Sequence, residues 1–369
     1  MIDLGASDLF LSTGTPPQIK IEGLTGPLGD KPLKPGQTRR IAYSVMRPSQ
    51  IRRFEAELEM NLGLSRPGIG RFRINVYRQR GEVALVVRFL RAEIPTIEQL
   101  RLPLILKSLV MEPRGLIILV GATGCGKSTT LAAMIDHRNR HSTGHIITVE
   151  DPIEYLHEHD KCVVDQREVG LDTLSYENAL KNALREAPDV LLIGEVRDRA
   201  TMQHALNFAE TGHLVLTTLH ATNANQALDR ILNFFPKSMH RQLLYDLSFN
   251  LRAMISQRLV VGTDCRRIPA TELLLNTPYA ADLIREGNLT RLKQLMENGS
   301  EHGMQTFDQC LFEMYRQGQV NLQEALKNAD SRNNLRLRVR LAEHQVDSEG
   351  LDLAVLHEGV VYEHRGARR

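Results

Sequence analysis

The eight residues 121–128 constrain the fold of this chain more than any other segment. They read Gly-Ala-Thr-Gly-Cys-Gly-Lys-Ser, which matches the phosphate-binding loop pattern Gly-x-x-x-x-Gly-Lys-Ser/Thr. The loop follows an apolar run expected as a strand over 116–120 and precedes a helix expected over 129–137, which is the context that the pattern requires. A glycine-rich turn without a ligand is the weaker alternative. The segment therefore predicts a site for a nucleoside triphosphate.

Each residue type in this loop has a chemical reason to be there. Glycines let backbone N–H groups surround phosphate oxygens, and the helix N-terminus adds a partial positive charge. Lys127 is expected to reach the β and γ phosphates, and Ser128 to offer its hydroxyl to Mg²⁺. The same N–H groups lead us to expect Cys125 as a thiolate. The candidate nucleotide-binding residues are Gly121, Ala122, Thr123, Gly124, Cys125, Gly126, Lys127, Ser128 and Thr129.

Carboxylates follow two further strands expected in this part of the chain. Glu150 and Glu154 lie in an acidic turn after the strand expected over 145–149, and Glu195 follows the strand expected over 190–193. The carboxyl ends of strands in an open parallel sheet are where such enzymes place their site. We expect Glu154 or Glu150 to orient or deprotonate water, and Glu195 to hold Mg²⁺ through water. Solvated acidic loops are the alternative for each turn.

Strands and helices alternate from residue 116 onward, which is typical of a parallel sheet covered on both faces. The first hundred residues predict a small α/β domain with one helix over 48–62, and the pattern after Val260 is mostly helical. The expected strands of the second domain are 116–120, 145–149, 190–193 and 214–219, alternating with helices over 176–187 and 199–210. The expected boundaries are a first domain 1–95, a linker 96–103, an ATPase core 104–265, a helical subdomain 266–345 and a flexible tail 346–369.

Composition excludes several other classes of protein. The net charge is only +2, so no global field would hold nucleic acid. The four cysteines are Cys125, Cys162, Cys265 and Cys310, and none forms a Cys-x-x-Cys pair, which argues against a disulfide framework or a zinc ribbon. Neither a signal peptide nor a membrane span is expected. These features predict a cytoplasmic protein.

Three segments resemble the motifs of secretion ATPases. Residues 150–154 look like the Asp box, residues 193–198 like an atypical Walker B motif, and residues 209–220 like the His box. The match is with the PilT/PilU retraction branch and extends over nearly the whole chain. In three segments the chain resembles PilU-type members more than PilT-type members; these are residues 223–227, 304–308 and 329–336.

The resemblance implies a PAS-like N-terminal α/β domain, a RecA-like P-loop domain with a helical C-terminal extension, and a hexameric ring. It also implies an ATP-hydrolysing motor for type IV pilus retraction and twitching motility, at the cytoplasmic face of the inner membrane. The implied partners are further copies of this chain, a pilus platform protein of that membrane and a paralogous PilT-type motor. The extra docking domain and four-cysteine insertion of assembly ATPases are missing, which favours retraction. Asp282 replaces a polar or basic residue of a late family motif, so the coupling role of that motif is open.

Several histidines and arginines are further candidates for functional roles. His220 follows the strand expected over 214–219 and could sense the γ phosphate, whereas helix capping or core packing is a strong alternative for His213. Metal binding by His157 and His159 is the weaker alternative to a surface loop. Arg73 and Arg88 match the inter-subunit arginines of the family, where a guanidinium can stabilise the transferring phosphoryl group of a neighbour.

Other functions stay open at this point. Within the family, the alternatives are a PilT-type main retraction motor and a type II secretion or pilus assembly ATPase. Outside it, they are a nucleotide-gated scaffold that regulates a partner motor, and a nucleic-acid translocase. Steady-state phosphate release, measured with and without DNA, would separate these classes.

Overall fold

The computed structural model describes residues 1–21, 23–66, 69–90, 93–299 and 303–343. The chain divides into two compact units, each built from helices and strands. The first unit comprises Met1–Gln99, Leu106–Leu116 and Ser128–Thr218, and the second comprises Leu100–Ile105, Ile117–Lys127 and the described residues from Leu219 onward. The domain boundaries expected from the sequence stay predictions, and the tail expected over 346–369 lies outside the described residues.

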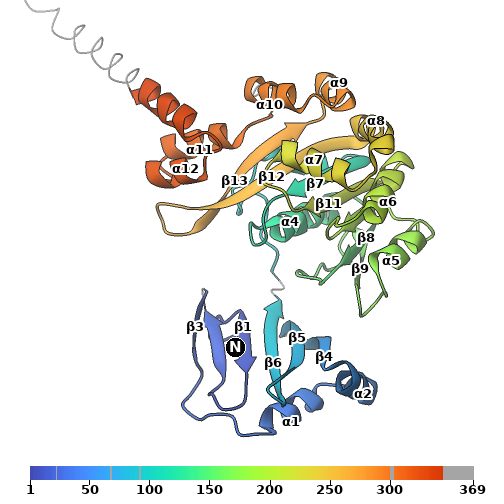
Figure 1. The fold of residues 1–369 in the computed structure, drawn as a ribbon, viewed down its shortest axis with the longest axis vertical. Helices are drawn as coiled ribbons and strands as arrows, with labels where there is room; N and C mark the ends of the chain where they lie inside the picture. Colours follow the sequence, from blue (N-terminus) through green and yellow to red (C-terminus); the bar gives the residue numbers. More distant parts are fainter. Residues whose placement is uncertain (22, 67–68, 91–92, 300–302, 344–369) are drawn as a thin grey trace, which may run out of the picture. The chain divides into compact units, whose positions relative to one another are not determined.

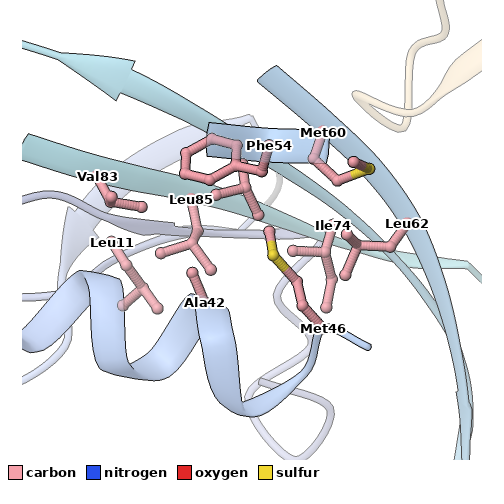
Figure 2. Packing of buried hydrophobic residues seen from close by; sticks show 10 residues of the cluster. Leu11, Ala42, Met46, Phe54, Met60, Leu62, Ile74, Val83 and Leu85 are labelled. Carbon is pink, nitrogen blue, oxygen red and sulfur yellow. The ribbon is translucent and has the colours of Figure 1, made fainter. Parts of the chain in front are cut away.

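An antiparallel sheet of six strands occupies the N-terminal part of the first unit, in the order β3-β2-β1-β6-β5-β4 (Figure 1). Its core joins Phe54 and Met46 to Ile74 and Leu85 of the sheet, as Figure 2 shows. Burying large apolar side chains on one face stabilises such a sheet. Its elements are β1 (Asp8–Leu11), β2 (Gln18–Ile21), β3 (Leu24–Pro27), α1 (Gln37–Ser44), α2 (Pro48–Glu57), β4 (Glu59–Arg66), β5 (Gly70–Gln79) and β6 (Glu82–Leu90).

The helix expected over 48–62 is wrong in its second half. Helix α2 ends at Glu57, because Leu58 adopts a left-handed conformation with φ of 65° that a helix cannot continue through. Residues 59–66 instead pair antiparallel with β5. Met60 and Leu62 alternate with more exposed neighbours and enter the core, which is the period of a strand.

A second sheet has seven strands in the order β13-β12-β7-β11-β10-β8-β9. Every residue of β7, β10 and β11 is buried, as expected for strands covered on both faces. The expected strands over 116–120, 145–149, 190–193 and 214–219 are thereby confirmed. The elements are α3 (Ile105–Val110), β7 (Gly115–Val120), α4 (Lys127–His141), β8 (Gly144–Glu150), β9 (Cys162–Glu168), α5 (Tyr176–Ala183), β10 (Val190–Ile193), α6 (Arg199–Glu210) and β11 (Leu214–Leu219).

The segment after Val260 contains a long strand that the sequence pattern did not predict. Strands β12 (Leu251–Val261) and β13 (Arg267–Leu275) form an antiparallel hairpin, and helices then follow. The remaining helices are α7 (Ala224–Asn233), η1 (Lys237–Met239), α8 (His240–Asn250), α9 (Pro278–Glu286), α10 (Leu289–Asn298), α11 (Phe307–Arg316) and α12 (Leu322–Asn328). Among the described helices, none has the length and hydropathy needed to cross a bilayer.

Candidate active site

The phosphate-binding loop joins the buried strand β7 to helix α4. Lys127, the first residue of α4, is 7% exposed, and its Nζ donates hydrogen bonds to the carbonyl oxygens of Gly121 (2.8 Å) and Ala122 (3.0 Å). The ammonium is therefore held over the loop, where phosphate oxygens bind in proteins of this type. Ala122, Thr123 and Gly124 are exposed at the tip of the loop.

The glycines of the loop have backbone conformations that other residues rarely adopt. Gly124 has φ of 79° and Gly126 has φ of 92°, and a Cβ on Gly126 would lie 2.7 Å from Nε2 of Gln257. Successive N–H groups in such conformations form an anion-binding concavity. The donor set and the shape of the loop thus fit a phosphate chain.

Gln257 of β12 supports this loop and was not singled out from the sequence. Its side chain is buried, and Nε2 donates a hydrogen bond of 2.8 Å to the carbonyl oxygen of Cys125. Its own carbonyl oxygen would lie 2.7 Å from a Cβ on Gly121. This close approach of a backbone oxygen requires glycine at position 121. Only the pairing of distant segments reveals this contact, since no motif contains Gln257.

The expectation of a thiolate at Cys125 is wrong. Cys125 is 7% exposed, and burial raises the pKa of its thiol, although the charge of Lys127 and two backbone hydrogen bonds act in the opposite direction. Its Sγ lies against Gly121, where an added Cβ would come within 2.4 Å. The thiol therefore packs inside the loop as a neutral group.

The acidic turn begins at Glu150, the last residue of β8. Burial raises the pKa of its carboxyl to about 7, while hydrogen bonds from Thr148 Oγ1 (2.7 Å) and Gln166 Nε2 (3.3 Å) lower it and the nearby charge of Glu154 raises it further. Gln166 also donates to the carbonyl of Tyr155 and accepts from the N–H of His157, so it holds the turn in shape. A carboxyl with this pKa can exchange protons near neutral pH.

The carboxyl ends of β8, β10 and β11 are tied together by hydrogen bonds. The N–H of Gly194 donates to the carbonyl of Val149 (2.8 Å), and the N–H of Val196 donates to the carbonyl of Thr218 (3.0 Å). Glu195 therefore lies beside the acidic turn, and it pairs with Arg197. Glu154 is exposed at the far end of the turn. The strand ends thus bring the predicted carboxylates of this unit to one edge of the sheet.

The two hydroxyl residues after Lys127 have different surroundings. Ser128 is partly buried, and Thr129 Oγ1 lies 2.9 Å from the hydroxyl of Tyr155. Within the described residues, no group of three or more His, Cys, Asp or Glu side chains could hold a metal ion by itself.

The histidines separate by position. His220 directly follows β11, at the carboxyl end of the sheet, whereas His213 directly precedes β11. His213 Nδ1 lies 3.1 Å from the carbonyl oxygen of Phe208, and its ring packs on the edge of the Phe208 ring. These contacts favour the structural role of His213. The imidazole of His157 is largely buried, which lowers its pKa to about 4, and Nδ1 of His159 accepts a hydrogen bond from the N–H of Val164.

Arg73 and Arg88 lie directly opposite each other on β5 and β6. Their side chains therefore share one face of the N-terminal sheet. Arg88 Nε donates a hydrogen bond of 2.9 Å to Asp8 Oδ1, and Asp8 is buried while the Arg88 side chain is 58% exposed. Asp8 was not singled out as a site residue, and here it orients one of the two expected arginines.

Residues 68–355 match a family model described as type II/IV secretion system protein. The chain is 53% identical to the type IV pilus ATPase PilU of Pseudomonas aeruginosa, covering 98% of this chain and 94% of that protein. It is 41% identical to the pilus retraction ATPase PilT of the same organism, covering 88% and 94%.

Two solved structures are similar to this chain in fold. A pilus retraction motor PilT with bound ADP aligns with a TM-score of 0.86 at 43% identity, over 91% of this chain and 96% of that one. The ATPase DotB of Legionella pneumophila aligns with a TM-score of 0.74 at 25% identity, over 88% and 91%. The expected fold class, an N-terminal α/β domain joined to a RecA-like ATPase domain, is confirmed by these likenesses.

Proposed function

Because the chain belongs to the type II/IV secretion system protein family, we propose that it is an ATP-hydrolysing motor for type IV pilus retraction, of the PilU-type accessory kind. The observation that carries this proposal is the phosphate-binding loop, with Lys127 held over it and glycines in anion-binding conformations. Neighbouring strands supply carboxylates at their carboxyl ends, where such a reaction needs them. The chain binds a nucleotide and is an ATPase, as its PilT-like fold supports.

Different residues of the loop bind different parts of ATP and its metal ion. Backbone N–H groups around Gly124 and Gly126 receive phosphate oxygens, and Lys127 exchanges loop carbonyls for phosphate. Ser128 and, through water, Glu195 would hold Mg²⁺, which neutralises charge on the phosphates when bound. Gln257 keeps the loop in shape through its hydrogen bond to the Cys125 carbonyl.

Glu150 is the better supported of the two candidate general bases. Its carboxyl has a pKa of about 7 because of burial, so it can accept a proton from water near neutral pH, whereas Glu154 is exposed. Glu154 remains a candidate for orienting that water. Loss of the γ phosphate would release contacts of His220, which follows β11, and so change the loop after it.

Oligomerisation completes the proposed site. Arg73 and Arg88 lie in the N-terminal sheet, and we place them against the phosphates of a neighbouring copy in a ring, where their charge stabilises the transferring phosphoryl group. A hexamer, the cytoplasmic face of the inner membrane, a pilus platform protein and a paralogous PilT-type motor are the proposed assembly, location and partners. The network at Glu150 favours turnover over a scaffold that only binds nucleotide.

The first test measures steady-state phosphate release by the full chain, and the effect of Lys127→Ala. Removing the ammonium should lower the rate of hydrolysis roughly a hundredfold or more, because the phosphates lose the positive charge that binds them. Lys181→Ala is the matched control, since this exposed lysine pairs with Glu177 on the surface of α5. Circular dichroism should show both variants folded.

Two results would contradict the proposal. Turnover by Lys127→Ala close to that of the unmodified chain would remove the phosphate loop from the reaction. A chain that binds ATP without releasing phosphate would be a nucleotide-gated scaffold. If hydrolysis is found, pilus retraction in a strain that lacks the gene, complemented by each variant, tests the motor function.

A further inference from the structure

Tyr176 brings a hydroxyl group to the acidic edge of the sheet. It is the first residue of α5, and its position is fixed because the Ser175 side chain caps this helix by accepting a hydrogen bond from the N–H of Asn178. The buried face of α5, which includes Ala179 and Leu180, anchors the helix against the rest of the unit. Tyr176 therefore begins a helix that is capped at its start and anchored by its buried face.

The hydroxyl oxygen of Tyr176 is buried and has no hydrogen-bond partner among the described residues. A buried hydroxyl without a partner costs about 1–3 kcal/mol relative to one that is satisfied. Such groups are rare in native proteins, and each needs an explanation. A phenylalanine here would keep the ring packing and avoid this cost. The hydroxyl is thus a group whose partner belongs to another state of the site.

The surroundings of this oxygen indicate what that partner is. A Cβ added to Gly194 would lie 2.9 Å from the Tyr176 oxygen and 3.3 Å from Cα of Glu150, so the hydroxyl lies over the glycine between the ends of β8 and β10. Burial raises the pKa of the phenol, and the negative charges of Asp151, Glu195 and Glu150 raise it further, while Arg197 lowers it. The group is therefore a neutral O–H donor beside three carboxylates.

We propose that Tyr176 is a positioning residue for ATP hydrolysis, whose hydroxyl donates a hydrogen bond to water held between the acidic turn and Glu195 when ATP is bound. Glu150 accepts a proton from water on one side, and Tyr176 fixes the orientation of that water from the other. A donor is needed there because carboxylates can only accept hydrogen bonds when ionised. The inference rests on the proposed hydrolysis of ATP.

The test replaces Tyr176 by phenylalanine, which removes only the hydroxyl. The turnover number should fall roughly ten- to hundredfold, as for the loss of one well-placed donor. The chain without nucleotide should melt at the same temperature or higher, because an unpartnered buried hydroxyl has been removed. The rise in melting temperature caused by a non-hydrolysable ATP analogue with Mg²⁺ should be smaller in the variant, and the rise caused by ADP unchanged.

Two controls accompany this variant. Tyr245→Phe removes a phenol hydroxyl from the exposed face of α8, and Glu177→Gln breaks a surface ion pair next to Tyr176. Both should retain full turnover. Unchanged hydrolysis by Tyr176→Phe would overturn the inference, and so would a loss of turnover accompanied by a lower melting temperature without nucleotide. If the unmodified chain does not hydrolyse ATP at all, the proposed function fails instead, so the two failures are distinguishable.

Discussion

At the scale of single residues, Glu150 combines burial with two hydrogen-bond donors, and this combination has a measurable pH signature. A general base must be ionised, so hydrolysis should rise as the pH increases through about 7, the pKa of this carboxyl. Glu150→Gln removes the base, and the residual rate should lose this rise. The measurement is the turnover number between pH 5.5 and 8.5, chosen to span roughly one to two units on either side of that pKa.

Glu154→Gln is the comparison for that experiment. If Glu154 only orients water, its variant should be slower but should keep the pH dependence. If the Glu150→Gln variant still showed the rise in turnover number with pH, another group would be the general base.

The same pKa bears on stability. The pKa of Glu150 is raised in the folded state from 4.5, so protonation favours folding. The stabilisation from this group is complete below pH 4.5 and is lost as the pH rises through about 7. At neutral pH the folded chain is therefore less stable than it would be with Glu150 protonated, and in return the carboxylate can act as a base.

Some site residues can be found from the sequence, and others cannot. Lys127 and Glu195 lie in short motifs whose chemistry depends only on neighbours in the chain. Gln257 and Tyr176 act across contacts between distant segments, and nothing in their local sequence distinguishes them from packing residues. The raised pKa of the Cys125 thiol is likewise not visible in the motif, because it results from burial of the thiol in the folded loop.

At the scale of elements, strand β12 supports the phosphate loop through one side chain. Gln257→Ala should weaken ADP binding roughly tenfold, since the Cys125 carbonyl loses its donor and the loop loses a contact that fixes its shape. Isothermal titration calorimetry measures this change. Gln242→Ala is the control, because the exposed amide of Gln242 donates a hydrogen bond to Asp246 on its own helix. Equal ADP affinity in the two variants would mean that the loop keeps its shape without Gln257.

The predictable elements are those with strong local patterns. Strands β7, β10 and β11 are wholly apolar and were predicted well. Strands β1 and β3 have only four residues each, too few to show a period. Helix α2 ends because Leu58 adopts a left-handed backbone conformation, which a leucine in the sequence does not predict. Strand β13 gains its identity from pairing with β12, which is a tertiary interaction.

At the scale of the whole molecule, the proposed ring makes each active site from two copies of the chain. Lys127→Ala keeps its arginines but has an inactive loop, and Arg88→Ala keeps its loop but cannot complete the site of a neighbour. Each variant alone should be inactive. When they exchange subunits, some interfaces combine an intact loop with an intact arginine, so phosphate release should return in proportion to their share.

That mixing experiment needs two checks. Exchange of subunits must be shown by fluorescence energy transfer, and unmodified chain must be titrated with each variant to detect stalled rings. No recovery at any ratio, with exchange demonstrated and no stalling, would mean that Arg88 serves its own chain.

The placement of Arg73 opposite Arg88 has a consequence for the ions around the protein. Two like charges on neighbouring strands repel each other. Asp8, which pairs with Arg88, and Glu168, whose carboxylate is stabilised by the charge of Arg73, offset part of that charge. In dilute subunits, mobile anions must gather at this face of the sheet. A triphosphate brought there by a neighbour would take their place and release them to the solvent. Assembly around nucleotide should then be favoured by low salt, so the ionic strength of the cell becomes one of the quantities that set how readily the ring closes.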